Sequence, residues 1–458
     1  MTTLKRFGWI ALTVGVGCAT LPNVSETIGE APAAGAPRRI VSAKGLLSST
    51  TSNAIMDRLS RSVDSTDILQ RFTAVIESVS GIPVTSGNKV TLLIDGPATY
   101  AAMFTAIQNA RASVNLESYI LDDDEAGYRF ADLLLKKRAE GVEVDVIYDS
   151  VGSLTTTAAF FKRLQDGGVR VVEFNQTNPL KAHGKWGLLR RDHRKILVVD
   201  CNVAIVGGIN ISDVYSSSPS GSRGGTGAPI AWRDTDVQIE GPAVAEFRKL
   251  FLDTWKTQNG PALPAPNDCP PQRQEGHALV RALGSTPGET NRTTFVAYVA
   301  GVTFAEHSVH LTNAYFVPDD QILNAFTDAA RRGVDVKIVL PSITDASVAL
   351  NAQRYNYSRL LKAGVKIYER RDVLMHAKTA VIDGIWSTVG STNMDYLSFL
   401  SNDEVNAVIL DREFAVEMEN AFARDLAESN PIQWALWKKR GIAERVREWV
   451  AHLFLRWL

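Results

Sequence analysis

Cysteine is scarce in this chain, and neither sign of charge is in excess. The 458 residues include three cysteines, which do not make a disulfide framework or a cysteine metal site. We expect Cys201 to be a packed thiol beside an apolar strand, with a Cys201–Cys269 bridge as the less favoured alternative. Lys and Arg number 49 and Asp and Glu 50, and the sequence pI is about 6.7. This balance gives no sign of the positive charge typical of nucleic-acid-binding proteins.

The apolar run near the start of the chain is too short for a membrane-spanning helix. It covers residues 7–17 and follows Lys5 and Arg6. A run of this length after basic residues is typical of a signal-peptide core. Small residues precede Cys18, as in bacterial lipoprotein cleavage sites, so we expect residues 1–17 to be a signal peptide and Cys18 to be lipidated. The alternatives are ordinary secretion, an uncleaved anchor, or a buried N-terminal segment.

One polar motif occurs twice in the chain. Residues 193–210 read HRKILVVDCNVAIVGGIN, and residues 376–393 read HAKTAVIDGIWSTVGSTN. In both copies Lys follows His by two positions, Asp follows Lys by five, and Gly and Asn follow at the same offsets. A single copy would be weak evidence, but two copies with matching offsets indicate a duplicated site. The shared polar residues are His193, Lys195, Asp200 and Asn210 in the first copy and His376, Lys378, Asp383 and Asn393 in the second.

The spacing within the motif predicts a phosphate-binding pocket. Alternate residues of a strand share a face, so the His and Lys of each copy lie on the same side. Two His, two Lys and two Asn brought together would make a cationic pocket whose Lys and Asn donate to phosphoryl oxygens. Gly208 and Ser391 are small, and we expect the backbone to approach a ligand there. A Lys beside each His disfavours a divalent cation, so we expect no metal and no cofactor.

The duplication extends to a whole domain. Strands alternate with helices in the same order in both halves, which predicts an α/β fold. The matching segments are residues 114–121, 127–140 and 142–148 in the first half and 309–316, 322–332 and 334–340 in the second. The predicted division is a signal peptide at residues 1–17, a flexible tether at 18–52, two domains at 53–262 and 263–430, and an amphipathic C-terminal helix at 431–458.

The paired motif resembles the signature of the phospholipase D superfamily, a duplicated HxKxxxxD followed by G[GS]xN. Within it, the chain most resembles bacterial cardiolipin synthases of the phospholipase D-like type. The resemblance covers roughly residues 70–430 and includes the segments NLESYIL at 115–121, WRDTDVQIEGPAV at 232–244 and SNDEVNAVILD at 401–411. It implies two tandem phospholipase D-like α/β/α sandwich domains that form one pseudo-symmetric unit, with the active site at their interface.

The resemblance also implies a mechanism without metal. One His forms a covalent phosphohistidine with the phosphatidyl group, and the other protonates the departing alcohol and then activates the acceptor. By analogy with the family, we expect His193 to be the nucleophile and His376 the general acid and base. Asp200 and Asp383 hold the motif turn in this family more often than they touch substrate.

Each catalytic imidazole needs a partner that fixes its tautomer. Asp234 and Glu404 stand at the family positions for this role, and Asp236 is an alternative to Asp234. Glu117 and Asp149 lie at predicted strand ends near the expected mouth of the site. They are candidates for support of the catalytic residues, with surface or strand-end roles as the alternative.

The first half carries an insertion directly before its motif. Eighteen residues separate Phe174 from His193, where the second half has only a few. We expect this insertion to contact lipid phosphates or headgroups, although a solvated basic loop has the same composition. The candidate substrate-binding residues in it are Lys181, Lys185, Arg190 and Arg191.

These features favour cardiolipin synthesis from phosphatidylglycerol-type lipids. The alternatives are hydrolysis by a phospholipase D to phosphatidic acid, a nucleic-acid phosphodiesterase, and a non-enzymatic membrane-binding protein. Basic residues and Trp alternate in residues 434–458, which favours membrane contact by an interfacial helix over a helix docked on the core. We therefore expect a phospholipid substrate, no nucleic acid, and a place in the bacterial cell envelope. Ala19 after Cys18 resembles sorting to the outer membrane, with the protein on its periplasmic face.

Overall fold

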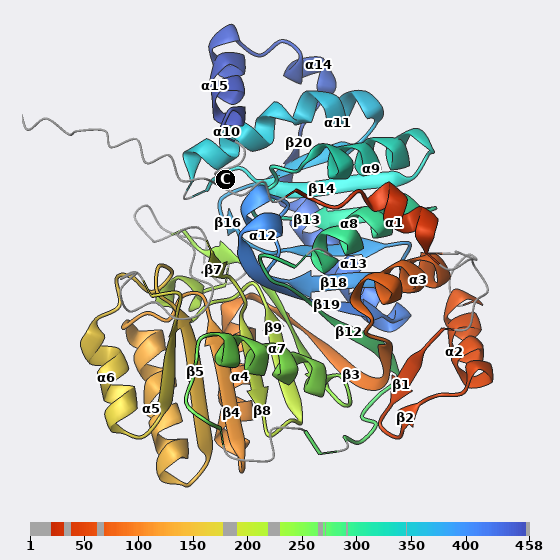
Figure 1. The fold of residues 1–458 in the computed structure, drawn as a ribbon. Coiled ribbons are helices and arrows are strands. Elements are labelled where there is room, and N and C mark those ends of the chain that lie inside the picture. Colours follow the sequence, from red (N-terminus) through yellow and green to blue (C-terminus); the bar gives the residue numbers. More distant parts are fainter. Residues whose placement is uncertain are drawn as a thin grey trace, which may run out of the picture.

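The computed structural model describes residues 20–31, 38–61, 68–176, 190–218, 230–263, 269–270, 272–289, 292–344 and 346–454. The chain forms two α/β halves, one below the other in Figure 1. The predicted α/β fold with a duplicated domain is confirmed. The signal peptide and Cys18 lie outside the described residues.

The first half contains a mixed sheet with its parallel strands at one side. Parallel neighbours need crossover connections, and helices supply them here. The remaining strands pair antiparallel. From one edge to the other, the strands are β6 (Arg170–Phe174), β5 (Glu143–Asp149), β4 (Ser113–Ser118), β8 (Ile196–Val199), β9 (Val203–Gly207), β11 (Thr235–Glu240) and β3 (Val84–Ile94).

The second half repeats this order strand for strand and adds one strand, β20 (Ser429–Pro431), at its outer edge. Its last strand pairs with β3, which joins the two sheets into one. The motif strands of the two halves therefore occupy equivalent places. The strands are β20 (Ser429–Pro431), β15 (Lys366–Arg370), β14 (Asp335–Pro341), β13 (Ser308–Thr312), β17 (Thr379–Ile382), β18 (Trp386–Gly390), β19 (Asn402–Leu410) and β12 (Ala278–Ser285).

Helices cover both faces of each sheet. Asp124 and Asp319 start equivalent helices by accepting hydrogen bonds from Gly127 N (2.9 Å) and Ile322 N (3.0 Å). In Figure 1, α5 (Glu125–Ala139) and α6 (Ala158–Asp166) lie beside the parallel strands of the first half. The helices are α4 (Asp95–Asn109), α5 (Glu125–Ala139), α6 (Ala158–Asp166) and α7 (Val244–Thr257) in the first half, and α8 (Thr293–Phe304), α9 (Asp320–Arg331), α10 (Ser347–Tyr355), α11 (Tyr357–Ala363), α12 (Tyr396–Leu400) and α13 (Arg412–Ala427) in the second, with the 3₁₀ turn η1 (Asp213–Tyr215).

An apolar core joins the two halves. Strands β8, β9 and β11 bury side chains against β17, β18 and β19, and α7 and α13 close this core. Val206, Val237, Val389 and Val405 are fully buried in it. Burial of apolar surface is the main source of stability, so the two halves are held as one body.

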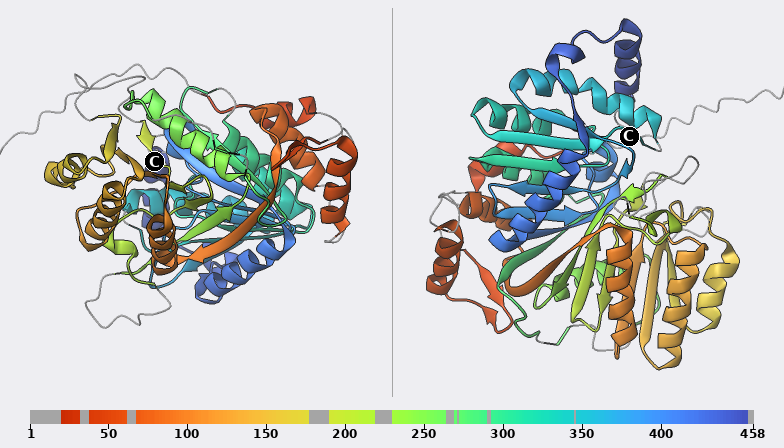
Figure 2. Two further views of the ribbon diagram at one scale, coloured as in Figure 1. Left: turned by 90° about the horizontal axis from the view of Figure 1, so that it is seen from below. Right: turned by 180° about the vertical axis from the view of Figure 1, so that it is seen from behind.

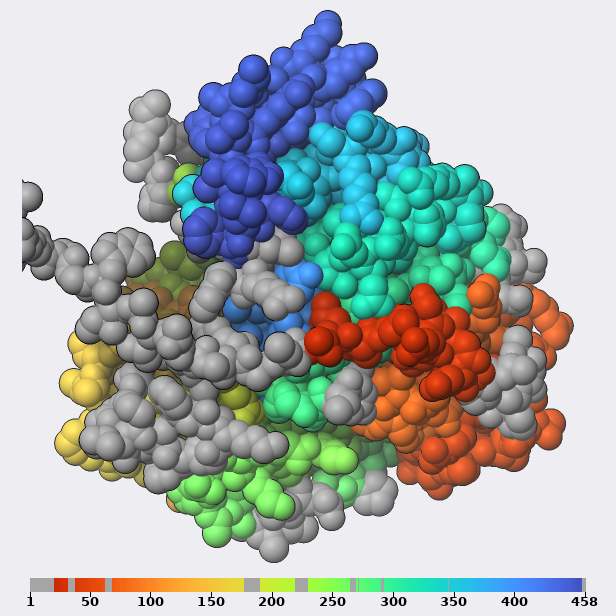
Figure 3. Space-filling view, turned by 45° about the horizontal axis from the view of Figure 1, so that its top comes forward, coloured from red at the N-terminus to blue at the C-terminus, as the bar shows by residue number. Residues whose placement is uncertain are grey.

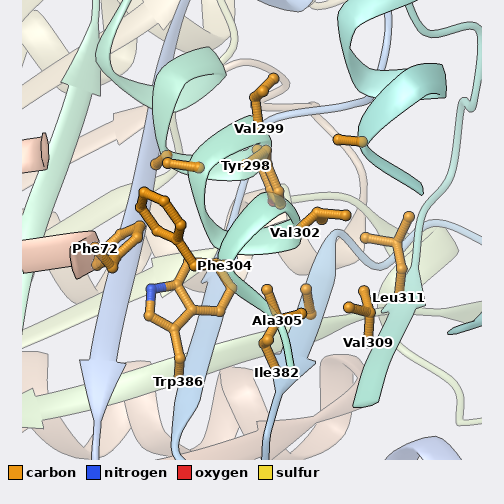
Figure 4. Packing of buried hydrophobic residues seen from close by; sticks show 14 of the residues in the cluster. Phe72, Tyr298, Val299, Val302, Phe304, Ala305, Val309, Leu311, Ile382 and Trp386 are labelled. Atoms are coloured by element: carbon orange, nitrogen blue, oxygen red, sulfur yellow. The ribbon is translucent and has the colours of Figure 1, made fainter. Parts of the chain in front are cut away.

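The predicted tether and the start of the first domain differ from the structure. Residues 18–52 were expected to be flexible, yet α1 (Val24–Glu30), β1 (Ile40–Ser42) and β2 (Gly45–Leu46) lie within them. Helix α1, α2 (Ser49–Arg61) and α3 (Ile68–Ser80) pack into the core of the second half, while β1 pairs with β3 of the first half. Phe72 of α3 meets Trp386 of β18 edge to face, with ring centroids 5.3 Å apart (Figure 4). This segment is ordered because α3 buries its apolar face against α8 of the second half, more than 200 residues later in the chain.

The cysteine prediction is also wrong. Cys201 is not a free thiol but forms a disulfide with Cys269, and the two Cα atoms are 5.6 Å apart. Cys201 lies in the turn between β8 and β9, and Cys269 lies between the halves of the chain. The sequence could not indicate this pair, because 68 positions separate the two residues and no local pattern links them.

The C-terminal segment is two short helices rather than one. α14 (Trp434–Trp437) and α15 (Ile442–His452) are separated by a turn that ends at Gly441. In Figure 1 and the right panel of Figure 2, α15 stands at the edge of the second half, beyond α10. Within the described ranges, the helices are too short or too polar to cross a bilayer.

Candidate active site

Two short strand pairings bring each half of the chain to the motif of the other. β7 (Arg191–Asp192) pairs with β19, and His193 N then donates to Asp403 O at 2.9 Å. β10 (Trp232–Arg233) pairs with β16 (Leu374–Met375), and His376 N donates to Arg233 O at 2.8 Å. In both cases the histidine bonds to the residue directly before a carboxylate of the other half.

That register places a carboxylate on each imidazole. His193 Nδ1 lies 3.1 and 3.0 Å from the two carboxylate oxygens of Glu404. His376 Nδ1 lies 2.7 Å from Asp234 Oδ2. The alternative residue, Asp236, faces away and accepts from Ile209 N at 3.1 Å. Each histidine thus receives its partner from the opposite half, and Nε2 is the nitrogen left for substrate.

Both histidines line one cavity of about 480 Å³ between the halves. His193 and His376 are only 9% and 6% exposed, so a ligand must enter the cavity to reach them. Asn210 and Asn393 line the same cavity. The other lining residues are Tyr119, Ile120, Val151, Arg191, Tyr215, Trp232, Tyr315, Val317, Ala346, Ala349, Asp395, Leu397 and Asn402.

The motif lysines lie beneath the histidines. Lys195 Nζ donates to His193 O at 2.6 Å, and Lys378 Nζ donates to His376 O. Both lysines are at most 2% exposed. Asn210 is held by two bonds, since its Oδ1 accepts from Ile120 N at 3.0 Å and its Nδ2 donates to the Tyr215 hydroxyl at 3.2 Å. The structure therefore brings together the His, Lys and Asn of both copies, with the two lysines beneath the cavity and not among its lining residues.

Gly208 and Ser391 contact the catalytic carboxylates rather than the cavity. A Cβ added at Gly208 would lie 2.2 Å from Asp234 Oδ1, so only glycine leaves room for Asp234. At the equivalent position, the Ser391 hydroxyl donates to Glu404 Oε2. Neither residue lines the cavity, although both were expected at the ligand.

Asp200 and Asp383 lie at the far ends of the motif strands and organise turns. Asp200 accepts hydrogen bonds from the backbone N–H groups of residues 111–113, at 2.7 to 2.8 Å. Asp383 does the same with residues 306–308, at 2.8 to 2.9 Å. Both have a φ of 51°, a left-handed conformation that Asp tolerates better than most residues. Their position fits the expected turn role and not contact with substrate.

Burial controls the charge of the site. It lowers the pKa of His376 to about 4, with help from the positive charge of Lys378. It also lowers the pKa of His193, against the opposing effect of Glu404. Burial and Lys378 lower the pKa of Lys195 to about 7. Both imidazoles are therefore neutral at pH 7, and a bound anion would raise all three pKa values.

The two catalytic carboxylates stay ionised. Burial alone would raise the pKa of Asp234, but His376 and Lys378 outweigh it and lower that pKa. His193 and Lys195 do the same for the pKa of Glu404. Asp236 behaves differently, because burial and the nearby Asp234 raise its pKa to about 8.

The basic insertion is divided by the structure. Lys181 and Lys185 lie outside the described residues. Arg190 is buried, and its Nε and Nη2 donate to the Asp403 carboxylate at 2.8 and 3.2 Å. Arg191 lines the cavity and lies 3.5 Å from Asp149. Of the two arginines, only Arg191 is placed to meet a ligand.

The candidate supporting acids, Glu117 and Asp149, lie behind the first histidine. Asp149 accepts from Asp192 N at 2.8 Å and so holds β7 in place. Glu117 is fully buried in β4, and burial raises its pKa. Asp149 thus supports the short strand directly before His193, and neither acid lines the cavity.

The aromatic lining of the cavity was missed from the sequence. The Tyr119 ring lies 5.2 Å from the His193 ring, and the Trp232 ring lies 5.1 Å from the His376 ring. The Tyr215 hydroxyl lies 3.2 Å from His376 Nδ1 and so joins Asn210 to this histidine. A single Tyr or Trp beside a motif carries no distinctive spacing. The only signal is that Tyr215 follows Asn210 by five residues, as Ser398 follows Asn393.

Comparison with known proteins agrees with this geometry. Residues 103–217 and 299–426 match a family described as "Cardiolipin synthase, PLD-like domain". The cardiolipin synthase of Geobacillus thermodenitrificans (strain NG80-2) is 33% identical over 373 residues, which cover 81% of this chain and 72% of that protein. Cardiolipin synthase A of Pseudomonas syringae pv. syringae (strain B728a) is 34% identical over 354 residues, covering 76% and 70%.

A solved structure shares the fold. The phosphatidylserine synthase of Haemophilus influenzae Rd KW20 has a TM-score of 0.60 and 13% identity, over 81% of this chain and 95% of that one. The fold and the paired site define a two-domain protein of the phospholipase D type. With the family match and relatives that are 33% and 34% identical, the chain belongs to the cardiolipin synthase, phospholipase D-like family. The predicted family is therefore confirmed.

Proposed function

We propose that this protein transfers phosphatidyl groups through a phosphohistidine intermediate and makes cardiolipin from phosphatidylglycerol-type lipids. One observation carries the proposal. Two buried histidines share a cavity, and each has Nδ1 on a carboxylate of the opposite half. An imidazole held in this way presents a basic Nε2 to the substrate. The relatives named cardiolipin synthase support a phospholipid as that substrate.

In the first step, His193 Nε2 attacks the phosphorus of the donor lipid. The bond from phosphorus to the glycerol headgroup breaks, and protonated His376 gives its proton to the departing oxygen. Because burial lowers the pKa of His376 to about 4, the phosphate anion must raise that pKa on binding for His376 to carry the proton. Lys195 and Lys378 neutralise the non-bridging oxygens, and so lower the barrier to attack.

In the second step, His376 removes the proton from a hydroxyl of the acceptor lipid. The acceptor oxygen bonds to phosphorus, the bond from phosphorus to His193 breaks, and the histidine is regenerated. Asn210 and Asn393 line the cavity as donors to the same oxygens. Arg191 is the proposed contact of the basic insertion with a lipid phosphate, while Arg190 and Ser391 position catalytic groups.

The walls of the cavity favour a lipid over a nucleic acid. Ile120, Val151, Val317, Ala349 and Leu397 line it, and such walls suit the glycerol ester region of a phospholipid. The chain as a whole has a net charge of −1, which gives no general attraction for a polyanion.

The proposal is tested with purified protein and phosphatidylglycerol vesicles, with lipid products followed by mass. Cardiolipin and glycerol, both absent with His193→Ala and with His376→Ala, are the expected result. Phosphatidic acid alone would replace the synthase with a phospholipase D. No lipid product, together with cleavage of a labelled oligonucleotide, would replace it with a phosphodiesterase.

We further propose that the protein acts in the bacterial cell envelope, held by lipid on Cys18 and by its C-terminal helices. The Cys201–Cys269 disulfide supports a place outside the cytosol, because disulfides persist in oxidising compartments. The proposed outer-membrane, periplasmic-face location rests on the sequence after Cys18. Labelled palmitate should be incorporated in cells and lost with Cys18→Ala, and equal labelling of both would contradict the anchor.

A further inference from the structure

Helix α15 carries an exposed apolar face. Ile442 is 80% exposed, Val446 50%, Trp449 52% and Leu453 60%, and these residues recur at helical spacing. The opposite side of the helix is narrow and buried. Apolar patches of this kind are rare on proteins that stay in water, and they mark contact surfaces. Val450, Phe454 and, on α14, Leu436 are exposed beside them.

A basic groove adjoins this face. It has a volume of about 840 Å³ and lies between α9 to α11 on one side and α14 and α15 on the other. Some of its cations are matched, since Arg440 pairs with Glu448 at 2.8 Å and Arg359 with Asp320 at 2.6 Å. Three are not matched by a carboxylate among the described residues, namely Lys362, Lys438 and Arg445.

The indole of α14 completes the groove. Lys362 Nζ lies 5.5 Å from the centroid of the Trp434 ring, and Arg445 donates to the backbone O of Lys438. The three unmatched cations and the indole therefore surround one space. A phosphate group is small enough to enter it and would supply the missing negative charge.

The same helix is docked on the wall of the catalytic cavity. Ala451 of α15 packs with Ala352 of α10 and with Val317, and Val317 lines that cavity. The His452 ring stacks on Tyr355 with centroids 3.9 Å apart. One turn before Ala352, Ala349 also lines the cavity. The apolar face and the basic groove therefore lie beside the active-site mouth, and Figure 3 shows these C-terminal residues, in dark blue, on the surface of the molecule.

We propose that α14 and α15 form a docking surface for an anionic phospholipid bilayer, with a lipid phosphate in the basic groove and the apolar face of α15 in the acyl boundary. This surface presents the catalytic cavity to the layer that holds its substrate, and in that sense it rests on the proposed function. A second copy of the chain fits less well, because Lys438, Lys439, Arg445 and Arg447 would face their own equivalents. Trp and basic residues around an apolar face match a bilayer interface.

The test uses the full chain carrying Cys18→Ala, so that an acyl anchor does not contribute. Flotation is measured with phosphatidylcholine vesicles, with and without phosphatidylglycerol. The double variant Trp449→Glu/Leu453→Glu should lower vesicle binding at least tenfold. Lys438→Glu/Arg445→Glu should lower binding to the anionic vesicles about 30-fold and leave binding to neutral vesicles nearly unchanged.

Matched controls change the same chemistry elsewhere. Val416→Glu alters an exposed apolar residue of α13, and Lys136→Glu/Lys249→Glu alters two exposed cations of the first half. Both controls should bind as the parent does. Inorganic phosphate is then added to the protein bound to anionic vesicles. Release only at phosphate concentrations that give high ionic strength supports a lipid phosphate in the groove. Release at low millimolar phosphate would assign the groove to free phosphate and overturn its lipid assignment.

Activity separates this inference from the proposed function. The α15 and groove variants should lose activity on vesicles while keeping it on monomeric short-chain phosphatidylglycerol. Parent-like vesicle binding by both double variants would overturn the docking surface. A second contrary outcome is a parent protein that sediments as a dimer while the α15 double variant sediments as a monomer and still binds vesicles. That result would assign the apolar face to a second copy of the chain. Vesicle binding without any lipid product would instead overturn the proposed function and leave the surface in place.

Discussion

Asp234 contacts Nδ1 of His376, and the proposed mechanism uses the other ring nitrogen, Nε2. Asp234→Asn keeps the size of the side chain but removes the charge that stabilises a protonated His376. Activity should fall at least about 100-fold, since a positioned acid–base group is worth roughly 10²–10⁴ in rate. Cardiolipin formation at saturating substrate measures it.

Asp236→Asn is the matched control, because it makes the same change two residues away on a side chain that faces Ile209 N. Its activity should stay within about threefold of the parent. Equal losses in both variants would contradict a special role of Asp234 and point to general damage at β11.

Asp236 also predicts a pH dependence of stability. Its pKa is about 8 in the folded protein and 3.8 as the ordinary value, so the unfolded chain releases this proton at lower pH than the folded one. Ionising Asp236 in the folded protein therefore costs free energy of folding. This cost is absent below pH 3.8, grows as the pH rises, and is complete above pH 8. Asp236→Asn removes it and should stabilise the protein by about 2 kcal/mol or more at pH 8.

Urea unfolding of the parent and of Asp236→Asn at pH 5 and at pH 8 measures this difference. The gain from the substitution should be larger at pH 8. A gain that is the same at both values, or larger at pH 5, would show that Asp236 is ionised in the folded protein.

At the scale of elements, β7 against β19 decides where His193 lies. Arg190 of the first half bonds to Asp403 of the second, next to Glu404. Arg190→Met would remove both hydrogen bonds from Arg190 to the buried Asp403 carboxylate and leave it the longer ion pair with Arg194, at 3.8 Å. We expect a loss of about 3 kcal/mol in stability, and a kcat reduced about tenfold with KM little changed.

Arg191→Met is the control for that experiment. Arg191 is the adjacent residue and lines the cavity, so its loss should raise KM more than it lowers kcat. If Arg190→Met instead raises KM alone, Arg190 binds substrate, as the sequence first suggested, and does not position the site.

At the scale of the whole molecule, the disulfide ties a motif turn to the segment between the halves. Cys201 and Cys269 close a stretch of 68 residues that includes β11 and α7. Cys269→Ser should lower the free energy of unfolding by about 2–4 kcal/mol, mainly because the unfolded chain gains freedom. Urea unfolding with and without reductant measures it. A parent protein equally stable under both conditions, with free thiols by mass, would contradict the bridge.

The arrangement of the two halves also explains why a catalytic carboxylate is found across the interface from its histidine. β3 and β12 join the sheets, the core of β8, β9, β11, β17, β18 and β19 fixes their relation, and β7 and β10 then cross to the other half. Each catalytic pair forms only when both halves are folded and joined, so the whole molecule is the unit of activity.

The sequence by itself determined the fold class, the duplication and the identity of the paired residues. Alternation in a strand puts His193 with Lys195 and His376 with Lys378, and those are local constraints of backbone geometry. The turn role of Asp200 was implied by the family resemblance and not by local spacing, since the N–H groups that it accepts from lie 87 to 89 positions earlier in the chain.

Only the tertiary structure decided which carboxylate serves which histidine, and that α3 packs on the second half. It also decided that Cys201 is bonded and that Tyr215 reaches His376. Those contacts join segments tens to hundreds of residues apart, and no local spacing records them. They are fixed by the burial of apolar faces against distant partners, which brings polar groups into hydrogen-bond distance once the core has formed.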